Sequence, residues 1–248
     1  MASQSIDPAV VDAFDDAQRR GWRLLSDVAR QVVVGMTEVD IAALARERLS
    51  DHGFDRWYHA PEVAVGERTR RPPHRHSARA RVQAGDFVTI DLGPATADTY
   101  ADVGVTLHVA PEGEPEPELL EVTRDCVRGC VGYASQWKTV GEIFVFARAW
   151  AVNHRVELAS TRAIGHAVLP KAGPLAVGFP RSAHAANLLR RNQMHFLHPV
   201  RLQGMWAIRP LISDGQRAAS FEEIIFVDGE DKRILGRDSL DEVGTLPD

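Results

Sequence analysis

The stretch GDFVTIDLGPATADTYADVGVTLHV, residues 85–109, decides how the fold of this chain is interpreted. Apolar and polar residues alternate on both sides of its centre, which predicts two strands, 87–92 and 100–109, joined by a turn at 93–98. Such a hairpin would bring Asp91 and Asp102 close together on one face. Paired carboxylates repel each other, and a shared proton, a cation or a metal relieves the repulsion. The stretch therefore predicts a carboxylate site, and two solvated turn aspartates are the plain alternative.

The composition is that of an ordinary globular chain. Its 248 residues are 44% hydrophobic and 25% charged, which is enough for one sizeable core. Neither a long apolar run nor a basic, then apolar, N-terminus is present, so we expect no membrane span and no signal peptide, and a cytoplasmic location. The net charge of −5 argues against a nucleic-acid partner. Cys126 and Cys130 lie in a helical segment and are expected to pack in the core.

The elements along the chain are of both kinds. Helices are predicted over 8–33, 37–52, 119–137 and 142–154, and further strands over 57–65, 206–212 and 221–227. Thr37 and Asp40 have the spacing of a capping box at the start of the second helix. Strands and helices occur in both halves without a Ser- or Gly-rich linker between them. We therefore expect an α+β fold, one domain over residues 1–248, built of two similar halves.

One segment, residues 67–81, is strongly basic, with six arginines and two histidines. Its adjacent prolines, Pro72 and Pro73, exclude a continuous helix, so a loop is predicted. Two interpretations stay open. The loop is either a solvated surface feature or a cationic lid or contact for an anionic substrate or partner.

Five motifs together resemble the M24 "pita-bread" family, which includes methionine aminopeptidase, prolidase and creatinase. They are GMTEVDIAALARERLSDHGF at 35–54, the aspartate hairpin, IGH at 164–166, GMWAIRP at 204–210 and FEEIIFV at 221–227. The resemblance covers residues from about 10 to 230. It implies a curved, mostly antiparallel sheet covered by helices, with pseudo-two-fold halves. We expect no additional N-terminal domain of the kind that prolidases and creatinases carry.

The resemblance also implies a metal site with one departure. Peptidase members hold two divalent metals with two Asp, one His and two Glu residues. Asp91, Asp102, His166 and Glu222 match four of these ligands. Arg209 stands where the remaining glutamate is expected, and a guanidinium that stays protonated cannot ligate a cation.

Other histidines are candidates for the site. The loop after His166 lacks the histidine that assists the reaction in peptidase members. His59 matches a position that lines the substrate pocket in aminopeptidases, although a histidine there is as often a packing residue. His195 and His198, in the motif MHFLHP, are candidate substrate contacts together with His59 and Arg209. The candidate catalytic residues are His166, Arg209 and His59.

The charges of these residues predict how many metal ions the site binds. Four carboxylates balance two divalent metals, whereas three carboxylates and one guanidinium leave a charge that one divalent metal balances. We therefore expect Arg209 to pair with Asp91 or Asp102, and a single Mn, Fe, Co or Zn ion to be held by a subset of Asp91, Asp102, His166 and Glu222. The alternative is a site without metal, as in creatinase, with His166 free to act as a general base.

Three functions are compatible with these residues. The first is an enzyme that acts on a small, carboxylate-bearing, amino-acid-like molecule and breaks or rearranges a C–N or related bond with one metal. The second is a metal-free hydrolase like creatinase, and the third is a non-catalytic binding module. We do not expect ordinary aminopeptidase activity, because loss of one metal removes the bridging water. The resemblance permits a homodimer as well as a monomer.

Overall fold

The aspartate hairpin forms the centre of the first half of the molecule. In the computed structural model, which describes residues 6–71, 75–111, 113–168 and 192–247, strand β2 (Phe87–Ala95) pairs antiparallel with β3 (Val103–His108). Strand β1 (Arg56–Val65) pairs with the other edge of β2 and completes the sheet β1-β2-β3. Both predicted strands exist, but the predicted turn starts too early, and the second strand begins at Val103 instead of residue 100. Strand β2 continues through Gly93 to Ala95, since β1 extends far enough to pair with it.

The second half supplies two further antiparallel sheets. One has the order β10-β9-β6-β5 and the other the order β4-β7-β8. Their members are β4 (Glu157–Leu158), β5 (Gly165–Val168), β6 (Gly204–Ile208), β7 (Leu211–Ser213), β8 (Ala218–Ser220), β9 (Glu223–Asp228) and β10 (Asp231–Leu235). The single strand predicted over 206–212 was wrong. The chain divides into β6 and β7 around Pro210, which has no N–H to give to a ladder.

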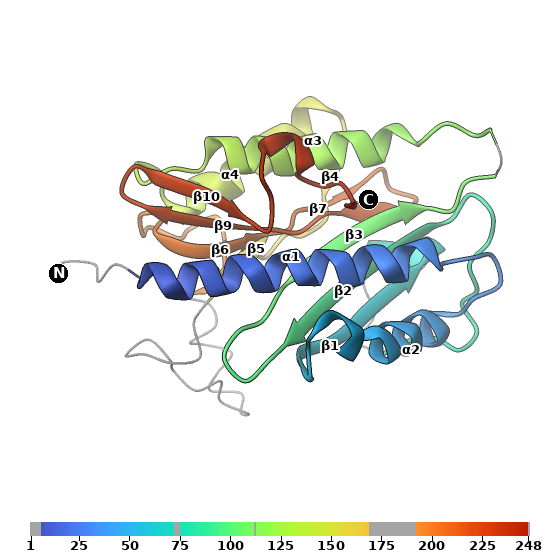
Figure 1. Cartoon of the computed structure of the whole chain (residues 1–248). Coiled ribbons are helices and arrows are strands. Elements are labelled where there is room, and N and C mark those ends of the chain that lie inside the picture. Colours follow the sequence, from blue (N-terminus) through green and yellow to red (C-terminus); the bar gives the residue numbers. More distant parts are fainter. Residues whose placement is uncertain (1–5, 72–74, 112, 169–191, 248) are drawn as a thin grey trace.

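Four helices cover these sheets (Figure 1): α1 (Pro8–Arg30), α2 (Glu38–Arg48), α3 (Glu118–Tyr133) and α4 (Val140–Asn153). Helix α1 runs across the molecule and contacts both the first sheet and β10. The predicted capping box of α2 is confirmed, because the Thr37 and Asp40 side chains accept from each other's backbone N–H groups. Helix α2 ends at Arg48, earlier than predicted, and a separate 3-10 turn follows at Ser50–His52.

The buried core joins the two halves of the chain. Its largest apolar cluster includes Leu25 and Ile90 from the first half and Ile143 and Ile225 from the second. Cys126 and Cys130 are free thiols buried in this core, and burial together with the hydrogen bond between the two raises the pKa of Cys130. The α+β class and the antiparallel sheets agree with the prediction. Each half begins with two helices, and antiparallel strands follow them: α1 and α2 precede β1 to β3, and α3 and α4 precede β4 to β10.

The basic segment is held to the fold by a buried carboxylate. A 3-10 turn, Gly66–Arg70, precedes the prolines, so the prediction of a loop throughout was wrong for its first residues. Glu38 has no exposed surface and accepts hydrogen bonds from Val65 N, Arg68 Nε and Ser77 N. Within the described part of the chain, no helix is long and apolar enough to cross a membrane.

Candidate active site

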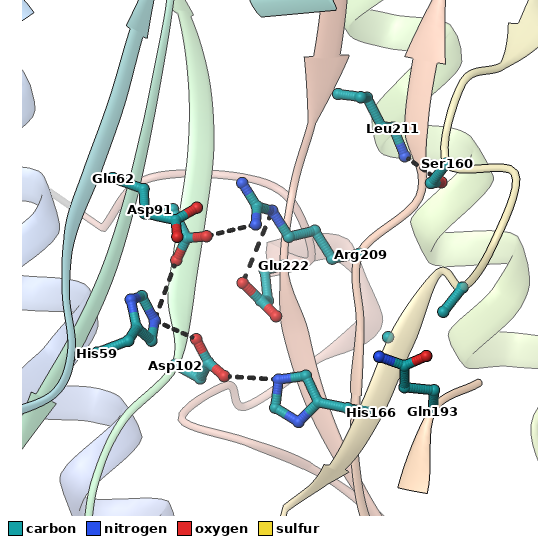
Figure 2. Close-up of a pocket in the computed structure, with 12 residues that line it drawn as sticks. His59, Glu62, Asp91, Asp102, Ser160, His166, Gln193, Arg209, Leu211 and Glu222 are labelled. Carbon is teal, nitrogen blue, oxygen red and sulfur yellow. Dashed lines mark hydrogen bonds and ion pairs between the residues drawn. The ribbon is translucent and has the colours of Figure 1, made fainter. Parts of the chain in front are cut away.

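A cavity of about 350 Å³ lies where the first sheet faces the strands of the second half (Figure 2). All four residues predicted as metal ligands line it, and so do Arg209 and His59. Among the described residues, the lining consists of His59, Glu62, Asp91, Asp102, Ser160, Ala163, Gly165, His166, Gln193, Arg209, Leu211 and Glu222. The fold therefore gathers into one cavity side chains that are far apart in the sequence.

The two aspartates enter the cavity from the hairpin. Asp91 lies in the middle of β2, opposite Gly104 of β3, and Asp102 lies just before β3. Both side chains are almost fully buried, at 5% and 3% exposed. Gln18 of α1 fixes the backbone at Asp102, because its amide donates to Asp102 O at 2.8 Å and accepts from Asp102 N at 3.0 Å. Helix α1 thus positions one carboxylate from outside the sheet.

Two imidazoles face these carboxylates. His166 Nε2 lies 3.0 Å from Asp102 Oδ2, and His59 Nε2 lies 3.1 Å from Asp102 Oδ1 and 3.4 Å from Asp91 Oδ1. Burial disfavours the charged imidazoles, but the Asp102 carboxylate outweighs it and raises the pKa of His59 to about 10 and that of His166 to about 9. In return, although burial acts in the opposite direction, the two histidines hold the pKa of Asp102 below its ordinary value.

His59 reaches the aspartates because the strands are irregular beside it. The register of β1 shifts on either side of His59, which pairs with Gly93 of β2. A Cβ at Gly93 would lie 2.7 Å from His59 Nε2, inside van der Waals contact. A residue with a side chain at this position would therefore push the imidazole away from the site.

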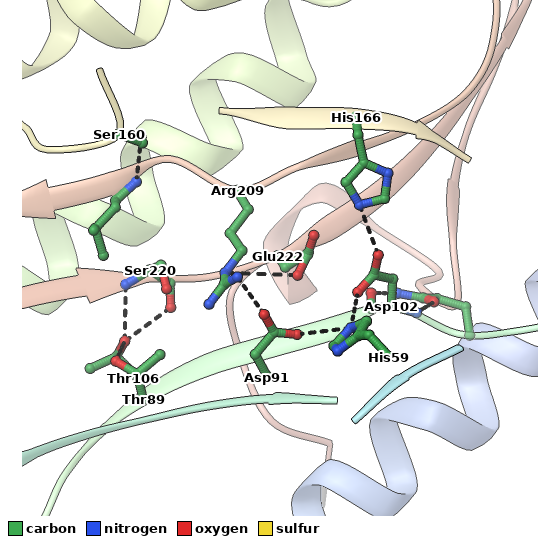
Figure 3. Close-up of polar contacts among 12 residues, drawn as sticks. His59, Thr89, Asp91, Asp102, Thr106, Ser160, His166, Arg209, Ser220 and Glu222 are labelled. Atoms are coloured by element: carbon green, nitrogen blue, oxygen red, sulfur yellow. Dashed lines mark hydrogen bonds and ion pairs between the residues drawn. The ribbon is translucent and has the colours of Figure 1, made fainter. Parts of the chain in front are cut away.

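Arg209 follows directly after β6 and joins the two acidic walls of the cavity. Its Nη1 forms an ion pair with Asp91 Oδ2, and its Nε lies 3.8 Å from Glu222 Oε2 (Figures 2 and 3). Burial raises the pKa values of Asp91 and Glu222, while the guanidinium charge opposes that rise at both. The arginine itself stays charged, because those carboxylates outweigh its burial and raise its pKa.

The comparisons with known proteins agree with this arrangement. Residues 12–228 match the family model described as metallopeptidase family M24. This chain belongs to metallopeptidase family M24. A curated M24-like relative, the Xaa-Pro dipeptidase of Pyrococcus horikoshii, is 24% identical over 138 residues, which are 56% of this chain and 39% of that protein. The chain thus spans less than half the length of that relative.

Solved structures share the fold of this M24 chain. It superposes on the X-Pro aminopeptidase of Thermotoga maritima with a TM-score of 0.74 and 20% identity, covering 95% of this chain and 63% of that one. It superposes on the methionine aminopeptidase of Thermotoga maritima with a TM-score of 0.75 and 19% identity, covering 96% of this chain and 100% of that one. These similarities establish the pita-bread fold.

The donors of this M24 chain fit one divalent metal. Asp102, His166 and Glu222 each offer a ligand atom, and the three atoms lie within 4.8 Å of one another. Carboxylate oxygens with one imidazole suit Mn, Fe, Co or Zn. A second group, His59, Asp91 and Asp102, meets the same distance criterion, but one oxygen of Asp91 is already bound to Arg209. The cavity therefore offers two groups of donor atoms that share Asp102, and Arg209 engages a carboxylate oxygen in the second group.

Two predicted substrate contacts do not reach the cavity of the M24 chain. His195 and His198 are absent from its lining, because the segment turns away after Met194, whose N–H donates to Gly165 O. His198 is buried instead against the indole ring of Trp206, 5.7 Å between ring centroids. Trp206 itself is part of the buried apolar core.

Three polar residues that line the cavity were not found from the sequence: Glu62, Ser160 and Gln193. Gln193 forms a β-bridge with His166, and only Met194 separates it from the predicted His195. Glu62 lies beside Asp91 in the register of β1 and β2. Regular alternation would place it on the opposite face from His59, and the shift in register between the two residues, which the sequence does not reveal, brings it to the site. Ser160 offers no sequence signal either, since its hydroxyl accepts from the N–H of Leu211 in a loop.

Proposed function

We propose that this M24 chain is a one-metal enzyme that breaks or rearranges a C–N or related bond in a small, carboxylate-bearing, amino-acid-like substrate. The observation that carries the proposal is the guanidinium of Arg209 between Asp91 and Glu222. Arg209 engages one oxygen of Asp91, and its fixed positive charge among the four carboxylates of the cavity, Glu62 included, disfavours a second cation there. Asp102, His166 and Glu222 would hold that ion, which would supply Lewis-acid activation of a water or a substrate carbonyl.

The volume of the cavity and the exposed part of the Arg209 guanidinium support this substrate class. A cavity of about 350 Å³ is near the lower end of the range of ligand pockets, which favours a small molecule. The contacts of Arg209 with Asp91 and Glu222 use its Nη1 and Nε atoms (Figure 2). The side chain is 22% exposed. A partly exposed Arg side chain is suited to binding a substrate carboxylate, which the glutamate at that position in peptidases could not do.

The two histidines would have different roles beside the bound substrate. The Nδ1 of His166 lies 3.1 Å from the carbonyl oxygen of Ala167, which holds the ring so that Nε2 can bind the ion. His59 lies between Asp91 and Asp102 and would keep a proton between the two carboxylates. Its position supports a role in proton exchange with the substrate.

The first test is the metal content of the purified chain. We expect elemental analysis after loading with Mn, Co or Zn to give one ion per chain, and Arg209→Glu to raise this toward two. Arg79→Glu, the same change at an exposed arginine outside the cavity, is the control and should keep one ion. Two ions in the unaltered chain would disprove the one-metal site, and no metal at all would favour the metal-free, creatinase-like alternative.

The second test concerns the reaction. Several structural neighbours are named as dipeptidases or aminopeptidases, so dipeptides and aminoacyl amides are the direct comparison substrates. We expect the metal-loaded chain to hydrolyse them poorly, because water cannot be activated between two ions. Turnover at ordinary enzyme rates, about 1–1,000 per second, would overturn the proposal of a non-peptidase.

A further inference from the structure

Exposed apolar side chains are concentrated on one surface of the molecule. This surface, which we call the α4 face, comprises helix α4 and the loops that pack on its N-terminal end. It carries most of the large apolar side chains that are exposed in the described residues: Trp137, Val145, Val152, Phe196, Leu197 and Val200. The loops belong to the same surface, because Gly141 N donates to His198 O and Val140 N donates to Val200 O. Exposed apolar clusters of this kind mark binding surfaces.

The α4 face contains a groove as well as protruding side chains. A second cavity, of about 500 Å³, is lined by Phe144, Arg148, Ala151, Val152, Val156, Glu157, Leu158, Thr161 and Phe196. Leu197, at 71% exposed, and Phe196, at 54%, lie at its edge. The surface thus offers an apolar groove and, next to it, apolar side chains that could enter such a groove.

Two opposite charges stand on this groove without partners. Arg148 belongs to α4 and Glu157 to β4, and both side chains are exposed. Neither takes part in an ion pair with any residue that the structure describes. A surface that carries one free cation and one free anion beside an apolar groove is complementary to itself under a two-fold rotation, because each charge then meets its opposite in the other copy.

We infer that the α4 face is the interface of a symmetric homodimer of this chain. Arg148 of each copy pairs with Glu157 of the other, and Phe196 and Leu197 of each copy enter the groove of the other. The interface also borders the active site, since Thr161 of the groove adjoins Ser160 of the catalytic cavity. The inference is independent of the proposed reaction, because it rests on a different surface.

Charge reversal with mixing tests the pairing directly. We expect sedimentation to show a dimer for the unaltered chain, and weaker dimers by at least about tenfold in Kd for Arg148→Glu and for Glu157→Arg, since each places like charges together twice. In an equimolar mixture of the two variants, every contact is again between opposite charges. The mixture should therefore form a heterodimer of nearly the original affinity.

Apolar variants test the groove. Phe196→Glu should give a monomer with an unchanged midpoint of thermal unfolding in dilute solution, because the side chain is largely exposed. Val34→Glu, at an equally exposed valine outside the α4 face, should leave the dimer intact. A monomeric unaltered chain at about 100 μM, or charge variants whose mixture fails to form a heterodimer, would overturn the inference.

Discussion

Neighbouring glutamates at positions 222 and 223 have opposite environments. Glu222 faces the cavity with Asp102 and His166, whereas Glu223 faces the core and forms two hydrogen bonds to Arg237, at 3.0 and 3.2 Å. Neighbouring side chains of a strand point to opposite faces, so Glu223 points away from the cavity. It is salt-bridged, but fully buried, since Arg237 closes over it and stacks on Trp22.

The two glutamates make a matched pair for mutation. Glu222→Gln should weaken metal binding by more than ~100-fold, since loss of a residue that only hydrogen-bonds a ligand already costs ~10–100-fold. The free energy of unfolding should change little. Glu223→Gln should keep the metal and lower the free energy of unfolding by about 3 kcal/mol, because Arg237 would stay buried without its counter-charge. Metal titration and urea unfolding of both variants give the comparison. Equal metal loss in the two variants would refute the assignment of Glu222 as the ligand.

The protonation of His166 predicts how metal binding depends on pH. In the chain without metal, its contact with Asp102 overcomes burial and raises the pKa of His166 to about 9. A metal that binds this imidazole must displace the proton, so the apparent affinity should rise with pH up to about 9 and level off above it. Calorimetric titrations in two buffers of different ionisation enthalpy should show release of at least one proton per ion at pH 7. An affinity that is the same at pH 6 and pH 8 would contradict the role of His166.

At the scale of elements, the position of His166 depends on how closely β5 approaches β6. Gly165 pairs with Ile208, and a Cβ there would lie 2.9 Å from the carbonyl carbon of Ala207, which is backbone and cannot move aside. We expect Gly165→Ala to lower the free energy of unfolding by about 1–3 kcal/mol and to weaken metal binding. Gly132→Ala, in α3 with open space around it, is the control and should stabilise the chain by about 0.5–1 kcal/mol. Chemical denaturation with metal titration measures both.

The elements that the sequence predicts correctly are those with strong local signals. Strand β2 alternates clearly, and Thr37 and Asp40 cap α2 through contacts within a few residues of each other. The elements that were missed have weak signals. Strand β4 has only two residues. Strand β10 has the sequence DKRIL, whose charged residues do not resemble a strand pattern, and it forms by pairing with β9. Their existence depends on partners that local patterns do not reveal.

At the scale of the whole molecule, the site exists only where the two halves meet. The first half supplies Asp91 and Asp102, and the second supplies His166, Arg209 and Glu222. The halves are joined beside the site by a bridge between Gly104 and Glu222 and, further along, by hydrogen bonds between Thr106 and Ser220 at 2.9 and 3.1 Å (Figure 3).

The resemblance to the M24 family could predict the members of this site, because their order along the chain follows the family. Gln193 and Ser160 depend instead on how loops of the second half fold back on the cavity. The ion pair of Arg209 with Asp91 could be anticipated from charge alone. The sequence could not show whether Arg209 pairs with Asp91 or with Asp102, since that depends on how β6 lies against β2.

Because its ligands come from both halves, a bound ion should stabilise the entire chain. Asp102 belongs to the first half, and His166 and Glu222 to the second, so unfolding of either half would release the ion. At a metal concentration of 100 times Kd, linkage adds about 2.7 kcal/mol, which corresponds to a rise in Tm of about 5–10 °C for a chain of this size. Thermal unfolding over a metal series measures the rise, and a chelator should reverse it. Glu222→Gln should show almost no rise under the same conditions. A Tm that does not change with metal in the unaltered chain would show that no ion bridges the two halves.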